Sequence, residues 1–470
     1  MKNSTPASVV DLRLASGHKA QGGTREHDTL TQEAAGLPEP VLSDAMRLRA
    51  IFAGSAGNLI EWYDFYVYAF TSLYFSSAFF PQSDRLVQVM ATSGIFAVGF
   101  LMRPIGGWYF GRYADRHGRQ RAMVVSVLIM GVGALLIAAL PTYATLGPAA
   151  PALLLAARML QGFSTGGQYG TAATYLSEIA GSRRRGFWSS FQYVTLIGGQ
   201  LCATLVILVL QRLLGEAGMT AWGWRIAFLI GAFAAIGIIL FRHHMHETAS
   251  AADRAGAEAG SLRELFRGST RAFLIVAALT AGGSLMFYAF TTYMQKFLVL
   301  TVGLTKPDAT LLMTVALIGF MALQPLMGLL SDRIGRRRNM VLFALLGAIA
   351  TVPIFSALAK AQSATEALLL VSAGLVICSL YTSVSGLFKA ELFPIHVRAL
   401  GVGLAYGIAN ALFGGTAENI ALGFKQVGVE SGFYWYVSAL CVVSLGAALL
   451  LPDTRRDNPL DRPTDRAIAA

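Results

Sequence analysis

A charged motif occurs twice in this chain, and each copy stands between two long apolar runs. The copies read Gly111-Arg-Tyr-Ala-Asp115-Arg116-His-Gly118-Arg119-Gln-Arg121 and Gly328-Leu-Leu-Ser-Asp332-Arg333-Ile-Gly335-Arg336-Arg-Arg338, with their aspartates 217 positions apart. A long-period repeat flanked by apolar stretches is typical of a membrane protein built from two similar halves. We therefore expect two related helical bundles with the functional site between them.

A second pair of charged residues supports the duplication. Glu178 precedes Arg185 by seven residues, and Glu391 precedes Arg398 by the same number. The two glutamates are 213 positions apart, which is nearly the spacing of the repeated motif. Both halves are therefore expected to share one design.

The composition indicates an integral membrane protein. Hydrophobic residues make up 55% of the 470 residues and charged residues 13%, against about 25% charged residues in soluble domains. The apolar residues are grouped in stretches of about 20, the length that a helix needs to cross the bilayer. We expect an all-α protein with twelve spans, at 50–80, 88–112, 121–141, 150–177, 187–210, 222–242, 272–299, 309–330, 339–359, 365–388, 400–423 and 432–451.

The net charge of +11 is explained by membrane topology. The segments expected in the cytoplasm hold 28 of the 37 Lys and Arg residues; they are 1–49, 112–121, 183–185, 242–271, 333–338, 389–398 and 452–470. This bias follows the positive-inside rule, so both termini are expected in the cytoplasm and no nucleic-acid partner is indicated.

The chain divides into five expected segments. Residues 1–45 are polar, contain no apolar core typical of a signal peptide, and are expected to form a disordered cytoplasmic tail. The other segments are a six-helix half at 46–242, a cytoplasmic loop at 243–271, a second six-helix half at 272–452 and a cytoplasmic tail at 453–470.

Four of the twelve spans lack charge over long runs, namely Met123–Leu140, Ile226–Leu240, Met340–Ala350 and Val437–Leu451. Such helices can face lipid all round. The other eight carry polar residues, which are costly in lipid unless they meet a partner or a polar cavity. We expect these eight helices to surround a central polar site.

The first span carries the densest polar group. Asn58, Glu61, Asp64 and Tyr68 are three, three and four positions apart, and therefore share one helix face. At about 1.5 Å per residue, Glu61 and Asp64 lie near the middle of the membrane. Two interpretations are open: one of these acids binds the coupling proton, or both pair with membrane arginines and hold helices together.

Two arginines inside the first half are the basic counterparts of these acids. Arg103 lies deep in the second span, and Arg158 begins a polar face that continues through Gln161 and Thr165. A guanidinium group matches a carboxylate bidentately, so either arginine could bind an acidic substrate. The alternative is structural pairing with Glu61 and Asp64, which we favour for Arg158, while substrate contact is favoured for Arg103.

Further polar residues are candidates for the central site. They are Tyr68, Gln192, Tyr193, Tyr288, Gln324, Tyr381, Ser385, Asn410 and Glu418. Each of these side chains can instead connect neighbouring helices. Paired glycines, such as Gly166 and Gly167, predict close helix packing.

The repeated motif predicts a gate at the cytoplasmic side. Asp115 and Asp332 can accept hydrogen bonds from the first amides of a neighbouring helix, or pair with an arginine across the interface between the halves. Such contacts form in one orientation of the halves and break in the other. The gate candidates are Gly111, Asp115, Arg116, Gly118, Arg119, Glu178, Arg185, Gly328, Asp332, Arg333, Gly335, Arg336, Glu391 and Arg398. The alternative role for these charges is to set membrane topology.

The doubled motif on twelve spans resembles the major facilitator superfamily. Within it, Gly57-Asn-Leu-Ile-Glu61-Trp-Tyr-Asp64, Phe100-Leu-Met-Arg103-Pro and Arg158-Met-Leu-Gln161-Gly are similar to the metabolite:proton symporter family. The segments Ser190–Leu201, Phe290–Lys296 and Lys389–Pro394 resemble the branch of that family that transports α-ketoglutarate. This resemblance implies uptake of a dicarboxylate together with protons; similar patterns also occur in carriers of proline, betaine, shikimate and citrate.

One position departs from the family pattern. The family typically has Gly-Gly-Glu-Tyr-Gly where this chain reads Gly166-Gly167-Gln168-Tyr169-Gly170. Glutamine keeps the size and hydrogen bonding of glutamate but does not titrate. If this position carries the proton, coupling is altered in this chain; if Glu61 or Asp64 carries it, little changes.

We therefore expect a monomeric bacterial inner-membrane symporter that takes a dicarboxylate and protons as its small-molecule partners, with the lipid bilayer as its surroundings. Three alternatives remain: a carrier of a zwitterion such as proline or betaine, a carrier of another organic acid, and a membrane sensor that transports nothing. No catalytic residues, metal ligands or cofactor motif are found in the sequence, so an enzyme is not expected.

Overall fold

The computed structural model describes residues 44–81, 85–117, 119–180, 184–241, 261–454 and 460. Residues 47–470 form one unit by their contacts, and the description below is confined to it. Most of the two expected tails, and residues 243–260 of the expected loop, lie outside the described residues. In the described ranges every regular element is a helix, as the composition predicted.

The first half contains the six expected spans, two of them in two pieces. Its helices are α2 (Asp44–Phe79), α3 (Arg85–Leu101), α4 (Arg103–His117), α5 (Arg119–Ala139), the short α6 (Tyr143–Leu146), α7 (Ala149–Ile179), α8 (Arg185–Ser189), α9 (Phe191–Gly218), η2 (Met219–Gly223) and α10 (Trp224–Phe241). The pairs α3–α4 and α8–α9 each form one span.

The second half repeats this plan with more interruptions. Its elements are α12 (Leu262–Gly268), α13 (Thr270–Tyr288), η4 (Ala289–Tyr293), α14 (Met294–Leu300), α15 (Lys306–Ile334), α16 (Arg336–Leu358), α17 (Ala364–Thr382), α18 (Ser385–Leu392), η5 (Ile395–Val397), α19 (Arg398–Ala409), η6 (Asn410–Gly414), α20 (Ala417–Gln426) and α21 (Ser431–Leu449). The helix α12 lies in the segment that the sequence predicts as a loop.

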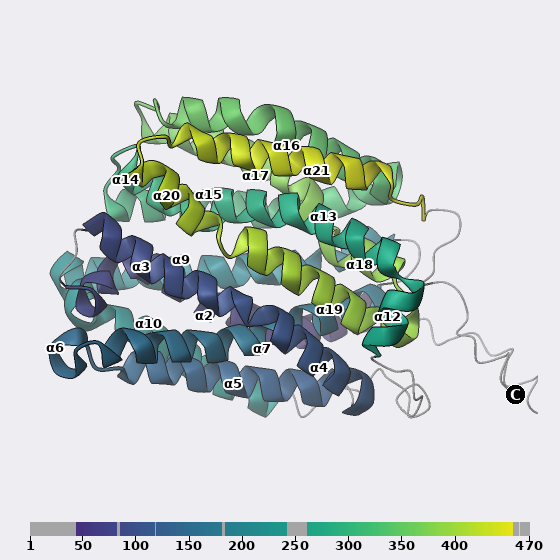
Figure 1. Ribbon diagram of the computed structural model, residues 1–470, viewed down its shortest axis with the longest axis horizontal. Coiled ribbons are helices and arrows are strands. Elements are labelled where there is room, and N and C mark those ends of the chain that lie inside the picture. Colours follow the sequence, from purple (N-terminus) through teal and green to yellow (C-terminus); the bar gives the residue numbers. More distant parts are fainter. Residues whose placement is uncertain are drawn as a thin grey trace, which may run out of the picture. The chain divides into compact units, whose positions relative to one another are not determined.

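The twelve expected spans are all helical. Within the described ranges, nine stretches are long and apolar enough to cross a membrane, and one of them, Arg185–Gly237, contains two expected spans. The remaining two are α2 and α7, which carry buried polar residues such as Asp64 and Arg158. Figure 1 shows the helices side by side, with α6 and α14 at one end and α12 and α18 at the other.

The four uncharged spans lie at the periphery, but they do not face lipid all round. The helices α5 and α10 pack together, as do α16 and α21, along opposite edges in Figure 1. On α5, Leu128 and Leu135 are exposed whereas Val127 and Ala134 are buried. The expectation of lipid on every side is therefore wrong, because each of these helices packs one face on the bundle.

The interface between the halves depends on close helix packing. Helix α19 of the second half packs against α4 and α7 of the first. Gly170 on α7 and Gly403 on α19 meet so closely that a side chain at Gly170 would collide with the backbone of Gly403. Small residues at such crossings allow two helix backbones to approach.

Several interior spans are interrupted where they approach the interface. Pro104 has no amide hydrogen, and the helix breaks there, with α3 ending at Leu101 and α4 beginning at Arg103. In the second half, η4 and η6 are π-helical turns, a feature often found at functional sites. These breaks place Arg103, Tyr288 and Asn410 next to irregular backbone.

Candidate functional site

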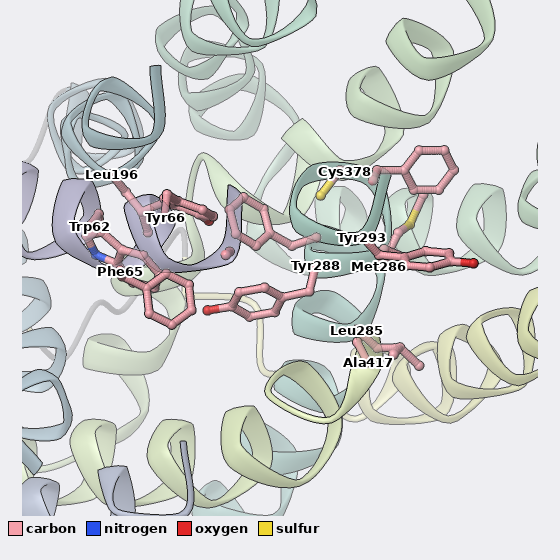
Figure 2. Close-up of a cluster of buried hydrophobic side chains, with 14 of the residues drawn as sticks. Trp62, Phe65, Tyr66, Leu196, Leu285, Met286, Tyr288, Tyr293, Cys378 and Ala417 are labelled. Atoms are coloured by element: carbon pink, nitrogen blue, oxygen red, sulfur yellow. The ribbon is translucent and has the colours of Figure 1, made fainter. Parts of the chain in front are cut away.

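Arg103 is buried at the helix break and faces the second half. Its Nη1 donates to the hydroxyl of Tyr288 on α13 at 3.4 Å. The guanidinium carbon lies 3.7 Å from the ring centre of Phe100 and 4.8 Å from that of Phe65. Figure 2 shows the Tyr288 hydroxyl directed toward Phe65 across the interface. The structure thus brings together two predicted site residues, Arg103 and Tyr288, from opposite halves.

Arg158 and Asp64 are linked through a third residue. Arg158 Nη1 donates to the Gln161 Oε1 atom at 2.6 Å, and Gln161 Nε2 donates to a carboxylate oxygen of Asp64. The guanidinium carbon of Arg158 also lies 4.2 Å from the ring centre of Tyr68, whose hydroxyl donates to the Thr92 carbonyl. This linkage resembles the structural role expected for Arg158, with glutamine as a bridge between base and acid.

The remaining candidates of the first half lie close by. Glu61 is buried one turn before Asp64 on α2. Asn58, on the same face, donates to the Gln192 carbonyl and the Thr195 hydroxyl, both at 3.0 Å, and so joins α2 to α9. Neither amide atom of the Gln192 side chain has a hydrogen-bond partner in the described structure. Tyr193 is buried with its ring against Phe287 of the second half. Gln192 and Tyr193 therefore face the interface.

A buried lysine was missed as a site residue. The sequence assigned Lys389 to a cytoplasmic segment because the apolar run ends at Phe388, but the structure buries it completely on α18. Its ammonium donates to the hydroxyls of Ser385 at 2.8 Å and Tyr169 at 3.0 Å. Tyr169 belongs to the first half and Lys389 to the second, so no local sequence pattern could have indicated this contact.

A buried ion pair in the second half was also missed. Lys296 and Glu418 are joined at 2.5 Å, and the Ser93 hydroxyl on α3 donates to the same carboxylate. The neighbouring Asn419 donates to the Met90 carbonyl at 3.1 Å. These contacts hold α20 to α3 across the interface. The available signal was a lysine inside an apolar span, which requires a partner.

The first half encloses a small cavity beside Arg103. A cavity of about 10 Å³ lies between Arg103, Arg158, Phe65 and Thr165, which is room for no more than one water molecule. Two sets of contacts join the halves at separate places: Ser93 on α3 donates to Glu418 on α20, and Asp332 accepts from the amides of α8. The two halves are therefore held together at both places.

Asp332 closes the interface at the end expected to be cytoplasmic. Its two carboxylate oxygens accept from the amides of Gly186 and Phe187, at 2.8 and 3.1 Å. These amides belong to the first turn of α8, where a helix favours negative charge. This contact is one of the two kinds that the sequence suggested for Asp332. Gly328 packs directly on Gly186, where a side chain on either residue would collide with the other's backbone.

The second copy of the motif builds a charge network around this contact. Arg336 pairs with Asp332 at 2.8 Å and approaches Glu391 at 3.7 Å, while Glu391 also accepts from Thr454. Gly335 has φ of 92°, a conformation that glycine adopts readily, and it separates α15 from α16. Arg333 is exposed and does not take part in this network as Arg336 does.

The other gate candidates are less tightly connected. Arg185 and Arg398 are buried and donate to the carbonyls of Ala180 and Phe393, the equivalent position in each half. Gly111 packs against Leu400 of α19, and Arg116 is exposed. Gly118 and the side chains of Asp115, Arg119, Gln168 and Glu178 lie outside the described residues.

Among the described side chains, no group of three or more His, Cys, Asp or Glu residues could hold a metal ion. The candidate site instead contains buried charges from both halves: Arg103, Arg158, Glu61 and Asp64 from the first, and Lys296, Lys389 and Glu418 from the second. Such groups inside a membrane protein point to ion or substrate pathways.

Each half of the chain matches the model of a known transporter family. Residues 50–250 match the family described as sugar (and other) transporter, and residues 285–469 match the major facilitator superfamily. Among solved structures, the proton:xylose symporter XylE bound to 6-bromo-6-deoxy-D-glucose superposes with a TM-score of 0.74 at 16% identity, covering 88% of this chain and 98% of that one. The partially occluded inward-open XylE from E. coli gives 0.71 at 18% identity, covering 88% and 100%.

Curated relatives are closer in sequence. The α-ketoglutarate permease of Escherichia coli (strain K12) is 55% identical over 405 residues, which are 86% of this chain and 94% of that protein. The citrate-proton symporter of Salmonella typhi is 34% identical, covering 88% and 95%. The proline/betaine transporter of Escherichia coli (strain K12) is 32% identical, covering 91% and 87%. By these matches and by its twelve-helix fold, the chain belongs to the major facilitator superfamily.

Proposed function

We propose that this protein imports α-ketoglutarate together with protons, by alternating access between two six-helix halves. The observation that carries the proposal is the 55% identity to α-ketoglutarate permease over 94% of that protein's length. Transport, not catalysis, is the proposed activity. The halves are residues 46–242 and 272–452, joined by the loop 243–271 and flanked by the tails 1–45 and 453–470.

Arg103 is proposed as the carboxylate anchor. It is buried at the interface, and its described contacts are a tyrosine hydroxyl and aromatic faces. Its Nε atom has no hydrogen-bond partner among the described residues. A planar guanidinium with donors to spare can bind a carboxylate with two parallel hydrogen bonds. Tyr288, Tyr68, Arg158, Gln192 and Tyr193 are proposed to complete the site.

Glu61 and Asp64 are proposed as the proton sites. A dianion entering a cell against an inside-negative potential is opposed by about 2.3 kcal/mol per charge per 100 mV, or about 4.6 kcal/mol for two charges. At least two protons per substrate remove this opposition. The hydrogen bond from Gln161 to Asp64 joins that carboxylate to Arg158, so its protonation is coupled to the polar network beside Arg103. Gln168 does not titrate and is assigned no proton.

The contacts at the two ends of the interface are proposed as alternating gates. The cytoplasmic gate consists of Asp332 and its partners on α8, supported by Arg336 and Glu391. We propose that the equivalent part in the first half consists of Gly111, Asp115, Arg116, Gly118, Arg119, Glu178 and Arg185. The gate in the second half is proposed to include Gly328, Arg333, Gly335 and Arg398 as well. The protein is placed in the bacterial inner membrane as a monomer with both termini in the cytoplasm.

A zwitterion such as proline or betaine is the second candidate substrate, because the proline/betaine transporter is 32% identical over 91% of this chain. Citrate is supported to a similar degree. Both likenesses are weaker than the one to α-ketoglutarate permease. Competition by unlabelled solutes separates the candidates.

The proposal is tested by uptake of labelled α-ketoglutarate into liposomes containing the purified protein, with the outside acidic or at equal pH. Accumulation that requires the gradient and is blocked by excess diacid, but not by betaine, is the expected result. Equilibration without accumulation would mean that the proton sites are inactive in this chain, and inhibition by betaine would favour the second candidate.

A further inference from the structure

Lys389 carries a cation into the bundle, and no carboxylate among the described residues is paired with it. Its side chain is fully buried on α18. The ammonium has three donors, and the described structure supplies two acceptors, the hydroxyls of Tyr169 and Ser385. Its nitrogen also lies 4.5 Å from the ring centre of Tyr406 and 5.0 Å from that of Tyr169. Hydroxyls and aromatic faces stabilise a cation but do not neutralise it.

The other buried lysine of the second half shows the contrast. Lys296 pairs with Glu418 at 2.5 Å, so its charge is neutralised inside the protein. For Lys389, in the part of the chain that the structure describes, no carboxylate pairs with the ammonium. An ionisable side chain in a membrane span is costly to bury and points to a functional partner. An anionic ligand would be such a partner.

Polar groups around Lys389 also lack partners among the described residues. The side-chain amide of Gln192 and the hydroxyl of Tyr381 are both buried without a hydrogen bond. Gln192 lies against Gly386, which is one turn before Lys389 on α18, and the Tyr381 ring centre is 5.5 Å from the ammonium. Buried polar atoms are nearly always satisfied, so a group of unsatisfied ones indicates a place for a polar ligand.

This group is continuous with the surroundings of Arg103. Tyr406, which lies beside the Lys389 ammonium, stacks on Tyr169 with ring centres 3.5 Å apart. The next residue, Gly407, packs against the backbone of Arg103 and Pro104. Asn410 follows directly after α19, and neither polar atom of its side-chain amide has a hydrogen-bond partner among the described residues. Arg103 from the first half and Lys389 from the second therefore flank one polar, tyrosine-lined region.

We propose that Lys389 is the second carboxylate anchor, binding one end of a dicarboxylate whose other end is held by Arg103. This inference rests on the proposed function and adds a physical reason for selecting dicarboxylates over monocarboxylates and zwitterions. Because the two cations belong to different halves, one substrate with two carboxylates connects both halves. A monocarboxylate or a zwitterion engages one cation and leaves the other unneutralised.

The test is a comparison of two keto acids of equal length. α-Ketoglutarate has two carboxylates, and 2-oxopentanoate has the same five carbons with a methyl group in place of the distal carboxylate. The concentration of each that half-inhibits uptake of labelled α-ketoglutarate is measured for the wild-type protein and its variants. In the wild-type protein, the half-inhibiting concentration of 2-oxopentanoate should exceed that of α-ketoglutarate about 100-fold, because the monoacid lacks one charge-assisted contact. In Lys389→Gln this ratio of the two concentrations should fall about tenfold or more.

Two variants make the result specific. Lys389→Arg keeps the charge and is expected to keep the ratio, while Lys360→Gln removes an exposed lysine and leaves the ratio unchanged. If Lys389→Gln does not fold, Ser385→Ala removes one support of the ammonium and is expected to lower the ratio several-fold. An unchanged ratio in whichever of these two variants is folded overturns the assignment.

The outcomes also separate this inference from the proposed function. A wild-type protein that neither transports nor is inhibited by any diacid overturns both. A wild-type protein that discriminates between the two acids, combined with a Lys389→Gln variant that discriminates equally well, overturns only the role of Lys389. Equal weakening of both acids in Lys389→Gln means that the lysine is structural, which also rejects the assignment.

Discussion

Asp332 holds the first turn of the opposite half's helix α8 by accepting the Gly186 amide at 2.8 Å. The Phe187 amide reaches the second oxygen of the same carboxylate at 3.1 Å. One side chain therefore satisfies two amides at a helix end and joins the two halves. Because the bond is made to backbone, its strength depends on the charge of Asp332 and on the approach of α8, and not on the identity of residue 187.

Replacing Asp332 with Asn is expected to open the end of the interface that is proposed to be cytoplasmic. The change keeps one acceptor but removes the charge that favours the helix end, a loss of about 1–3 kcal/mol. In a background without the three native cysteines, a cysteine introduced at the buried Ser331 should react about 5–100 times faster with a polar alkylating reagent. Arg338→Gln, an exposed arginine nearby that is given no gate role, is the control; equal rates in all variants would contradict the proposed gate.

Arg103→Gln is expected to abolish saturable uptake while leaving the fold intact. Loss of a bidentate, charge-assisted contact should weaken substrate binding by about 100-fold or more. Arg103→Lys keeps the charge but loses the planar fork, and should recover only part of the binding. Uptake kinetics and melting temperature are measured together, with the exposed Arg212→Gln as control. Normal uptake by a folded Arg103→Gln variant would remove this residue from the site.

Asp64→Asn and Glu61→Gln test the two proposed proton sites separately. A neutral side chain that does not titrate should abolish gradient-driven accumulation, while exchange of labelled for unlabelled substrate persists. The measurement is accumulation against exchange in the same liposomes, and the exposed Asp308→Asn serves as control. Full accumulation in both variants would exclude these acids as sole proton carriers. In that case Gln168→Glu should show whether an added acid at position 168 changes the number of protons.

The Lys296–Glu418 pair gives a stability prediction. Glu418→Gln leaves a buried ammonium without its partner, which costs about 3–5 kcal/mol, whereas the double variant with Lys296→Met should recover most of the loss. The pair Lys425–Glu430 is about one-fifth exposed at 3.3 Å, so Glu430→Gln should cost less than about 1 kcal/mol. Thermal unfolding in detergent compares the three variants. Similar losses for both pairs would contradict the assigned burial.

The sequence predicted the fold well because the relevant signals are local. A span requires about 20 apolar residues, and the duplicated motif defines the two halves. Uncharged runs indicated the peripheral helices, although packing of one face on the bundle could not be deduced from them. Arg103 and Asp64 were identified because a charge inside an apolar run is conspicuous.

The missing parts of the site depend on contacts between distant residues. Lys389 follows directly after an apolar run, so its position alone resembled the start of a loop; only the hydroxyl of Tyr169, 220 positions earlier, shows that it is buried. Glu418 was identified as polar, but its partners Lys296 and Ser93 come from two other helices. Which base meets which acid is set by helix packing, and one sequence does not contain that information.

The small cavity beside Arg103 has a consequence for inhibitor design. About 10 Å³ leaves no space for a drug-sized compound beside Arg103 in this arrangement of the helices. A compound that reaches this arginine must keep one end of the interface open, and its bulk then prevents the halves from closing. Inhibitors of the centre are therefore expected to act from a single side of the membrane and to trap one orientation of the carrier.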